Sequence, residues 1–172
     1  MVAGAVGGLA ASYAMTLFLR VLDEIGLDPH PHHPQHSVER GDRDAAHEDR
    51  EGGQDDATVE MVERVANALG IEMSRRAKEL AGPITHYVFG SAMGALYGAL
   101  AARHKLVTAG MGLAFGGLAW LLFDEIAIPV LRLSPPPTRT PLPVHLRAAG
   151  AHAVYGPGTE LGRRLALAVL ER

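Results

Sequence analysis

An uncharged run from Leu80 to Ala102, bounded by Glu79 and Arg103, most constrains how this chain can fold. Its 23 residues suffice to cross a bilayer core of about 30 Å at about 1.5 Å per helical residue. Glycine recurs at every fourth position inside the run, at Gly90, Gly94 and Gly98. In water each glycine weakens a helix by nearly ~1 kcal/mol relative to alanine, whereas in lipid a glycine stripe lets a neighbouring helix approach closely. The run therefore predicts a membrane-spanning helix with a glycine contact face.

The composition agrees with small-residue packing and excludes several classes of protein. Hydrophobic residues make up 48% of the 172 residues but aromatic residues only 5%, and there are 20 glycines. A soluble core is normally filled by Leu, Ile, Val and Phe instead. Because the chain has no cysteine, disulfides, thiolate catalysis and cysteine-based metal sites are excluded. A net charge of -3 and the lack of a basic-aromatic patch disfavour nucleic acid as a partner.

The apolar segments predict an all-α fold, a four-helix transmembrane bundle with a polar loop and a short amphipathic helix between spans one and two. Residues 1–27 hold the first span, which lacks a basic n-region and is therefore interpreted as a retained helix rather than a cleaved signal. Residues 28–56 form a polar, His-rich loop with too little apolar surface to order itself. Residues 57–80 form amphipathic surface helices, with apolar residues at intervals of three and four.

Residues 81–172 are predicted to hold the remaining three spans. We expect Gly82-Pro83 to separate the surface helices from span two. Span three runs from Leu106 to about Leu131, and Gly112 and Gly116 on it are further predicted helix-packing positions. Span four runs from about Val144 to Leu170 and is expected to be kinked at Pro157.

Four alternating spans would bring ionisable side chains from three helices to one depth, roughly 10 Å below the surface that carries the loops. The candidate polar cluster comprises His86, Tyr87, Asp124, Glu125, His152, Tyr155 and Glu160. Such groups are costly in a membrane and should face inward and pair. Three interpretations remain open: hydrogen bonds that only fix helix register, a proton- or ion-handling site, and a haem or transition-metal site using His86 and His152. Glu160 is also spaced to pair with Arg163 and Arg164 on its own helix.

A second candidate metal site lies in the polar loop. It comprises His30, His32, His33 and His36. Histidine-rich tracts can bind zinc, copper or nickel, but this spacing is irregular, and a solvated linker is the simpler interpretation.

Three motifs together resemble a known family. They are Thr85-His86-Tyr87 with the glycine ladder, Leu133-Ser134-Pro135-Pro136 preceded by Pro129, and the series His152, Val154, Gly156, Glu160, Arg163 and Arg164. This combination resembles the bacterial membrane-protein family typified by the inner-membrane protein YagU, whose molecular function is unknown. The resemblance covers roughly residues 80–164. It implies a multi-pass protein of the bacterial inner membrane and a link to acid resistance, but no reaction.

The sequence thus predicts a small integral membrane protein that is not an enzyme and whose main partner is the lipid bilayer. One hypothesis is proton or ion handling by the His and carboxylate residues. A second is a haem- or metal-binding membrane protein. A third is a non-catalytic scaffold subunit whose glycine faces bind other membrane helices or a second copy of the chain.

Overall fold

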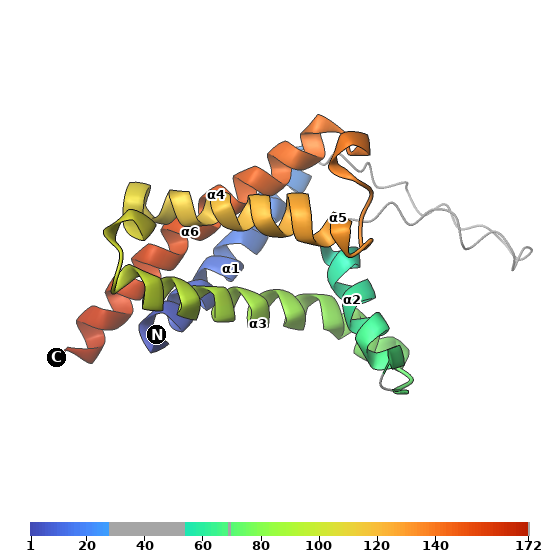
Figure 1. The fold of residues 1–172 in the computed structure, drawn as a ribbon, viewed down its shortest axis with the longest axis horizontal. Helices are drawn as coiled ribbons and strands as arrows, with labels where there is room; N and C mark the ends of the chain where they lie inside the picture. The colour runs from blue at the N-terminus through green and yellow to red at the C-terminus, as the bar shows by residue number, and fades with distance from the viewer. Residues whose placement is uncertain (28–53, 69, 172) are drawn as a thin grey trace, which may run out of the picture.

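The computed structural model describes residues 1–27, 54–68 and 70–171, and this part of the chain is helical, without a strand (Figure 1). The α-helices are α1 (Val2–Glu24), α2 (Gln54–Ala68), α3 (Arg75–Ala101), α4 (Leu113–Trp120), α5 (Ile128–Val130) and α6 (Leu142–Leu170). The segments η1 (Lys105–Gly112) and η3 (Pro137–Arg139) are 3₁₀-helical, and η2 (Leu121–Ala127) is π-helical. The predicted histidine site of the polar loop lies outside the described residues.

Four long helical rods build the bundle: α1, α3, the continuous run α4–η2–α5, and α6. In Figure 1, α3 and α4 cross the front of the molecule, α6 passes behind α4, and α1 lies behind both. The shorter α2 stands at one end, at an angle to the rods. The all-helical prediction is therefore confirmed for the described residues, and the amphipathic helix predicted between the first two rods is α2.

Glycines set how closely the rods approach. A Cβ added to Gly94 of α3 would lie 2.6 Å from Gly8 Cα of α1, and one added to Gly162 of α6 would lie 2.7 Å from Gly7 Cα. A Cβ on Gly112 would lie 2.5 Å from Gly156 O of α6. Real Cβ atoms do not come this close, so the backbones of α1 and α3, of α1 and α6, and of η1–α4 and α6 are in direct contact.

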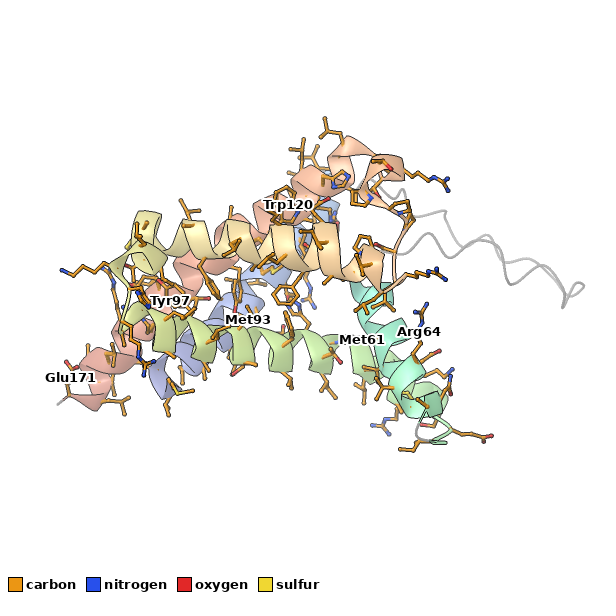
Figure 2. All side chains as sticks on the ribbon, viewed as in Figure 1. Met61, Arg64, Met93, Tyr97, Trp120 and Glu171 are labelled. Carbon is orange, nitrogen blue, oxygen red and sulfur yellow. The ribbon has the colours of Figure 1, made fainter. Side chains whose placement is uncertain are left out.

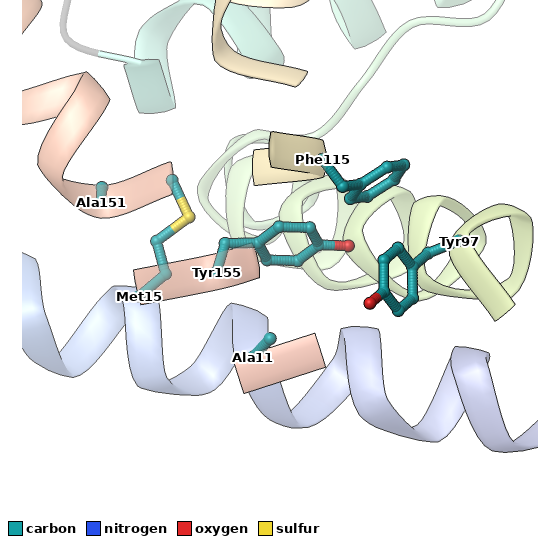
Figure 3. Close-up of a cluster of buried hydrophobic side chains, with 6 residues drawn as sticks. All are labelled: Ala11, Met15, Tyr97, Phe115, Ala151 and Tyr155. Carbon is teal, nitrogen blue, oxygen red and sulfur yellow. The ribbon is translucent and has the colours of Figure 1, made fainter. Parts of the chain in front are cut away.

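The apolar centre is small and lies where the rods meet. Its buried members are Ala11, Met15, Tyr97, Phe115, Ala151 and Tyr155 (Figure 3). Only three of these side chains are aromatic, and the ring centroids of Tyr97 and Phe115 are 4.9 Å apart. The bundle is thus held mainly by close backbone contact, with a few large side chains filling the space that remains.

Two prolines lie inside continuous helices. We expected Gly82-Pro83 to end a helix, but α3 continues through it, and α6 contains Pro157. Each proline follows a glycine, Gly82 or Gly156. A proline ring clashes with the Cβ of the preceding residue when that residue is helical, and glycine has no Cβ. The expected break at Pro83 was therefore wrong. Gly82 has no Cβ with which the proline ring could clash.

The first part of the third rod is irregular. The span predicted from Leu106 to about Leu131 agrees with the apolar segment Lys105–Val130, but η1 is not continuous helix: Ala109 is extended, and Gly110, Met111 and Gly112 have φ of 59°, 59° and 88°. Continuous helix runs only from Leu113 to Val130. The left-handed turn lets Gly112 pass directly over Gly156, a position at which a side chain would not fit.

Large apolar side chains lie mainly on the outside of the rods. On α1 the buried stripe is small, with Ala3, Gly4, Gly7, Gly8, Ala11 and Ser12 beside Met15. Its exposed side carries Val2, Val6, Leu9, Tyr13, Leu17 and Val21. Within the described residues, two segments, Val2–Glu24 and Lys105–Val130, are long and apolar enough to cross a membrane by length and composition. The predicted spans on α3 and α6 are not among them.

Candidate functional site

The acids of the predicted cluster lie in a π-helical segment. Asp124 and Glu125 are adjacent residues in the middle of η2. π-Helical segments are rare and are found frequently at functional sites. The facing helix α6 carries two histidines seven residues apart, His145 and His152, which therefore lie on the same face about 10 Å apart along the axis.

Glu125 pairs with His145. The imidazole Nδ1 contacts Glu125 Oε1, and Nε2 lies 3.2 Å from Pro137 O in the proline-rich connection. His145 sits in the first turn of α6, beside this connection and before the apolar part of the helix. The hydrogen bond with Glu125 raises the pKa of His145 above its ordinary value of 6.5. Both ring nitrogens have acceptors within reach, which is the arrangement that holds a protonated, positively charged imidazole.

Asp124 pairs with His152, deeper in the bundle. His152 Nδ1 lies 3.0 Å from Ala148 O of its own helix and 3.4 Å from Asp124 Oδ2. Because both neighbours are acceptors, Nδ1 is the ring nitrogen that donates here. The side chains of His152 and Asp124 are both largely buried, at 11% and 12% exposure. The imidazole of His152 and the carboxylate of Asp124 thus face each other between α6 and η2.

A third charged pair lies on another face of α6. Arg147 of α6 forms an ion pair with Asp23 near the end of α1. Because Arg147 follows His145 by two residues, it faces away from the side of α6 that carries His145 and His152. This ion pair therefore connects α6 to α1 and is separate from the two His–carboxylate pairs.

The other predicted histidine, His86, lies in a different environment. His86 Nε2 is 3.3 Å from Ser12 O of α1, and the hydroxyl of Tyr87 donates to Thr16 Oγ1 at 3.4 Å. The rings of His86 and Tyr87 contact each other edge to face, 5.4 Å apart. The structure therefore places these two residues at the contact of α3 with α1, whereas His152 faces the acids of η2.

Glu160 belongs to a third set of groups. Its carboxylate accepts hydrogen bonds from Arg163 Nε and Nη2 (2.8 and 2.9 Å), from Arg164 Nε (2.6 Å) and from the Tyr97 hydroxyl of α3 (2.8 Å). The Glu160 side chain is 0% exposed. It lies eight residues beyond His152 on α6, about 12 Å along the axis, so the predicted single cluster is divided. The spacing with Arg163 and Arg164 was visible in the sequence, but Tyr97 was missed.

The remaining predicted residues are packing elements. The Tyr155 hydroxyl donates to Gly90 O at 2.6 Å, which ties α6 to α3. All five glycines predicted to face other helices lie at helix contacts: Gly90, Gly94 and Gly98 against α1, and Gly112 and Gly116 against α6. These faces are used inside the chain rather than offered to a partner helix.

Metal coordination by the described residues finds little geometric support. No three His, Asp or Glu side chains in the described part of the chain are grouped so that they could hold one metal ion. His86 lies against α1, and His152 contacts Asp124 and Ala148. These two histidines therefore contact different helices in the structure, and the haem or metal interpretation stays a prediction.

His145 was missed as a member of the site and Arg147 as a link between α6 and α1, although one signal for His145 was present. An interval of seven residues puts two side chains on the same face of a helix, and His145 precedes His152 by seven. Nothing comparable marks Arg147, whose partner Asp23 is 124 residues away in sequence.

The fold and the site together define a class: an all-helical protein with two helices suited to crossing a membrane and with buried His–carboxylate pairs between its rods. The chain belongs to the family described as "Protein of unknown function (DUF1440)", whose model matches residues 62–161. The match spans α2 from Val62, all of α3 to α5, and α6 as far as Leu161. Comparisons with curated proteins and with solved structures gave no match. The YagU-like name and the bacterial inner-membrane location stay predictions.

Proposed function

We propose that this chain is a four-span integral membrane protein, not an enzyme, that takes up and passes on protons through the His–carboxylate pairs of α6. The observation that carries the proposal is the pair of contacts Glu125–His145 and Asp124–His152. The first pair is at the start of α6 and the second is about two turns deeper, so they form an ordered path inward from the loop side.

The distribution of side chains supports a membrane location. Exposed large apolar residues occur along all four rods; examples from mid-rod positions are Leu9, Val88, Leu118 and Leu161. Small residues occupy the contacts between the rods. A water-soluble protein places its large apolar residues inside and rarely exposes contiguous apolar surface of this extent. Lipid is the partner that solvates such a surface, and small residues at helix contacts are typical of membrane bundles.

The chemistry of the pairs supports proton handling. Histidine is the side chain whose ordinary pKa lies nearest neutral pH. Ionisable residues within a membrane are costly and usually mark ion or proton pathways. Glu160 is paired with the permanent charges of Arg163 and Arg164. At Asp124 and Glu125 the partners are titratable.

The experiment is proton flux into liposomes that contain the purified protein, followed by an enclosed pH-sensitive dye after a pH jump. We expect flux above that of empty liposomes, with loss of most of it in His152→Gln and in Asp124→Asn. His104→Gln is the matched control, since His104 is exposed in the connection between α3 and η1. Flux no greater than in empty liposomes, or full flux in His152→Gln, would count against the proposal.

A further inference from the structure

The two halves of the bundle repeat the same helix pair. An offset of 104 residues maps Gly8 of α1 onto Gly112, and an offset of 66 maps Gly90 of α3 onto Gly156 of α6. Both glycine pairs are backbone contacts: a Cβ on Gly8 or on Gly112 would collide with the carbonyl oxygen of its partner. The pair α1–α3 and the pair α4–α6 therefore have the same antiparallel register.

The neighbouring positions agree with the same offsets. Ser12 maps onto Gly116, and each sits against the next turn of its partner: Ser12 O accepts from His86, while a Cβ on Gly116 would collide with the carbonyl oxygen of His152. The sequences agree as well. Gly8-Leu9-Ala10 matches Gly112-Leu113-Ala114, and His86-x-Val88-Phe89-Gly90 matches His152-x-Val154-Tyr155-Gly156. The two antiparallel pairs thus share one glycine register, and the second pair repeats the first in the same order along the chain, as parallel repeats do in some membrane transporters.

The two repeats meet along two sides, and these sides differ. On the α1–α6 side the contact residues are small: Gly7 lies against Gly162, and a Cβ on Gly158 would be 3.1 Å from Ala11 Cβ. The same offsets place Met111, Phe115, Ala92 and Leu96 at the equivalent positions of the α3–α4 side. The larger side chains keep α3 and α4 apart, and Leu96 and Met111 remain 46% and 42% exposed. One side is therefore closed by backbone contact and the other is not.

Side chains bridge the α3–α4 side. The rings of Phe89 and Phe123 are 4.9 Å apart, as are those of Tyr97 and Phe115. Figure 2 shows Met93 and Tyr97 between the ribbons of α3 and α4. Such contacts between rings can slide or separate without moving a backbone-to-backbone contact.

Hydrogen bonds from α2 link the two repeats at one end of the α3–α4 side. Arg64 of α2 donates hydrogen bonds to Leu131 O at 2.8 Å and to Arg132 O at 3.0 Å, beyond the end of α5 (Figure 2). These carbonyls belong to the last turn of the third rod, where a helix leaves acceptors unsatisfied. Arg132 has a φ of 56°, a left-handed conformation that is uncommon for a residue with a side chain. Because α2 is fastened to α3 by Glu63 and Lys78 (3.1 Å), Arg64 links the first repeat to the second.

We infer that the α3–α4 side of the bundle is a movable joint, hinged at the α1–α6 contact and held shut by Arg64 of α2 together with two buried hydroxyl bonds between α3 and α6, Tyr97 to Glu160 and Tyr155 to Gly90. In the closed state Arg64 caps the rod that carries Asp124 and Glu125. Release of Arg64 weakens the closed state, and when the two hydroxyl bonds also break, α4 moves away from α3 while both glycine-packed pairs stay intact. The inference does not depend on proton binding, so its test is separate from the flux experiment.

The test is a distance measurement between paired spin labels in the full chain in detergent. The chain has no cysteine, so introduced cysteines are labelled selectively. Leu96→Cys with Met111→Cys reports on the α3–α4 side, and Val6→Cys with Leu161→Cys reports on the α1–α6 side. Each pair is measured alone and with Arg64→Gln or with Arg76→Gln, the latter removing an exposed arginine on the first turn of α3.

We expect a narrow distance distribution for the 6/161 pair under all conditions. The 96/111 pair should show a broader distribution that shifts to longer distances with Arg64→Gln and not with Arg76→Gln. A 96/111 distribution as narrow as that of 6/161 would overturn the inference, as would one that Arg64→Gln leaves unchanged. If Arg64→Gln prevents folding, the charge-preserving Arg64→Lys, which cannot bridge two carbonyls with one planar group, replaces it with the same expected shift.

Discussion

At the scale of single residues, the Glu125–His145 pair gives a pH dependence with a definite sign. The carboxylate raises the pKa of His145 above 6.5 in the folded protein. A group whose pKa is higher in the folded state stabilises the fold fully below its unfolded pKa, and this contribution is lost as the pH rises through the folded value. Glu125→Gln should therefore destabilise the protein most on the acidic side of 6.5 and hardly at all at alkaline pH. Thermal unfolding in detergent across this pH range, together with NMR titration of His145, measures both effects.

The control for this prediction is Glu24→Gln, since Glu24 is exposed at the end of α1. A stability difference between wild type and Glu125→Gln that grows toward alkaline pH would contradict the assigned pairing. An unchanged His145 titration in Glu125→Gln would do the same.

Glu160 is the residue whose charge the fold depends on most directly. Its fully buried carboxylate accepts bonds from two arginines and from Tyr97. Removing one member of a buried charged group leaves the others uncompensated, which typically costs about 3–5 kcal/mol. Arg164 is 55% exposed, so water can solvate its charge when the carboxylate is removed. We therefore expect Glu160→Gln to lower the free energy of unfolding by about 3 kcal/mol, the lower end of this range. Glu171→Gln, at the exposed end of α6, should change unfolding in detergent little; equal effects of both changes would refute this role.

At the scale of helices, the glycine contacts predict opposite effects for two similar substitutions. Gly94→Ala would drive a Cβ to 2.6 Å from Gly8 Cα, whereas at Gly117 nothing lies within 4 Å. Forcing a methyl group into a closed contact costs about 1–3 kcal/mol, and a backbone neighbour that cannot shift puts Gly94→Ala at the upper end. At an open helical position, glycine to alanine instead stabilises by roughly 0.5–1 kcal/mol. Unfolding of both variants in the same detergent decides the matter, and a loss of equal size at Gly117 would argue against the packing described.

The helices also show what could be read from the sequence. The glycine positions and the approximate extent of three rods follow from four-residue spacing and from uncharged length. The π segment could not be foreseen, because residue spacing does not distinguish a single π-helical turn from the α-helix around it. The irregular first part of the third rod could not be foreseen either, because the left-handed turn at Gly110 to Gly112 is fixed by the passage over Gly156. Pairings such as Glu125 with His145 depend on how two rods cross. The spacing of residues within one rod gives no information about that crossing.

At the scale of the whole molecule, the central question is whether water or lipid surrounds the rods. The substitution Leu118→Lys distinguishes the two cases. Leu118 is 52% exposed in the middle of the candidate span Lys105–Val130. In water, replacing an exposed residue there by lysine changes stability by no more than about 0.5 kcal/mol. In a bilayer the same position lies near the centre of a span, where lysine costs about 3 kcal/mol on insertion scales.

We therefore expect Leu118→Lys to reduce the amount of protein recovered in the membrane fraction of expressing cells severalfold. Val169→Lys is the matched control, because Val169 is 71% exposed in the last turn of α6, where a long cationic side chain can reach the membrane surface. If Leu118→Lys is recovered like the wild type and both stay in solution without detergent, the apolar exterior does not face lipid, and the four-span proposal fails. If only Leu118→Lys is depleted, the exterior of the third rod lies in the bilayer, as the four-span proposal requires.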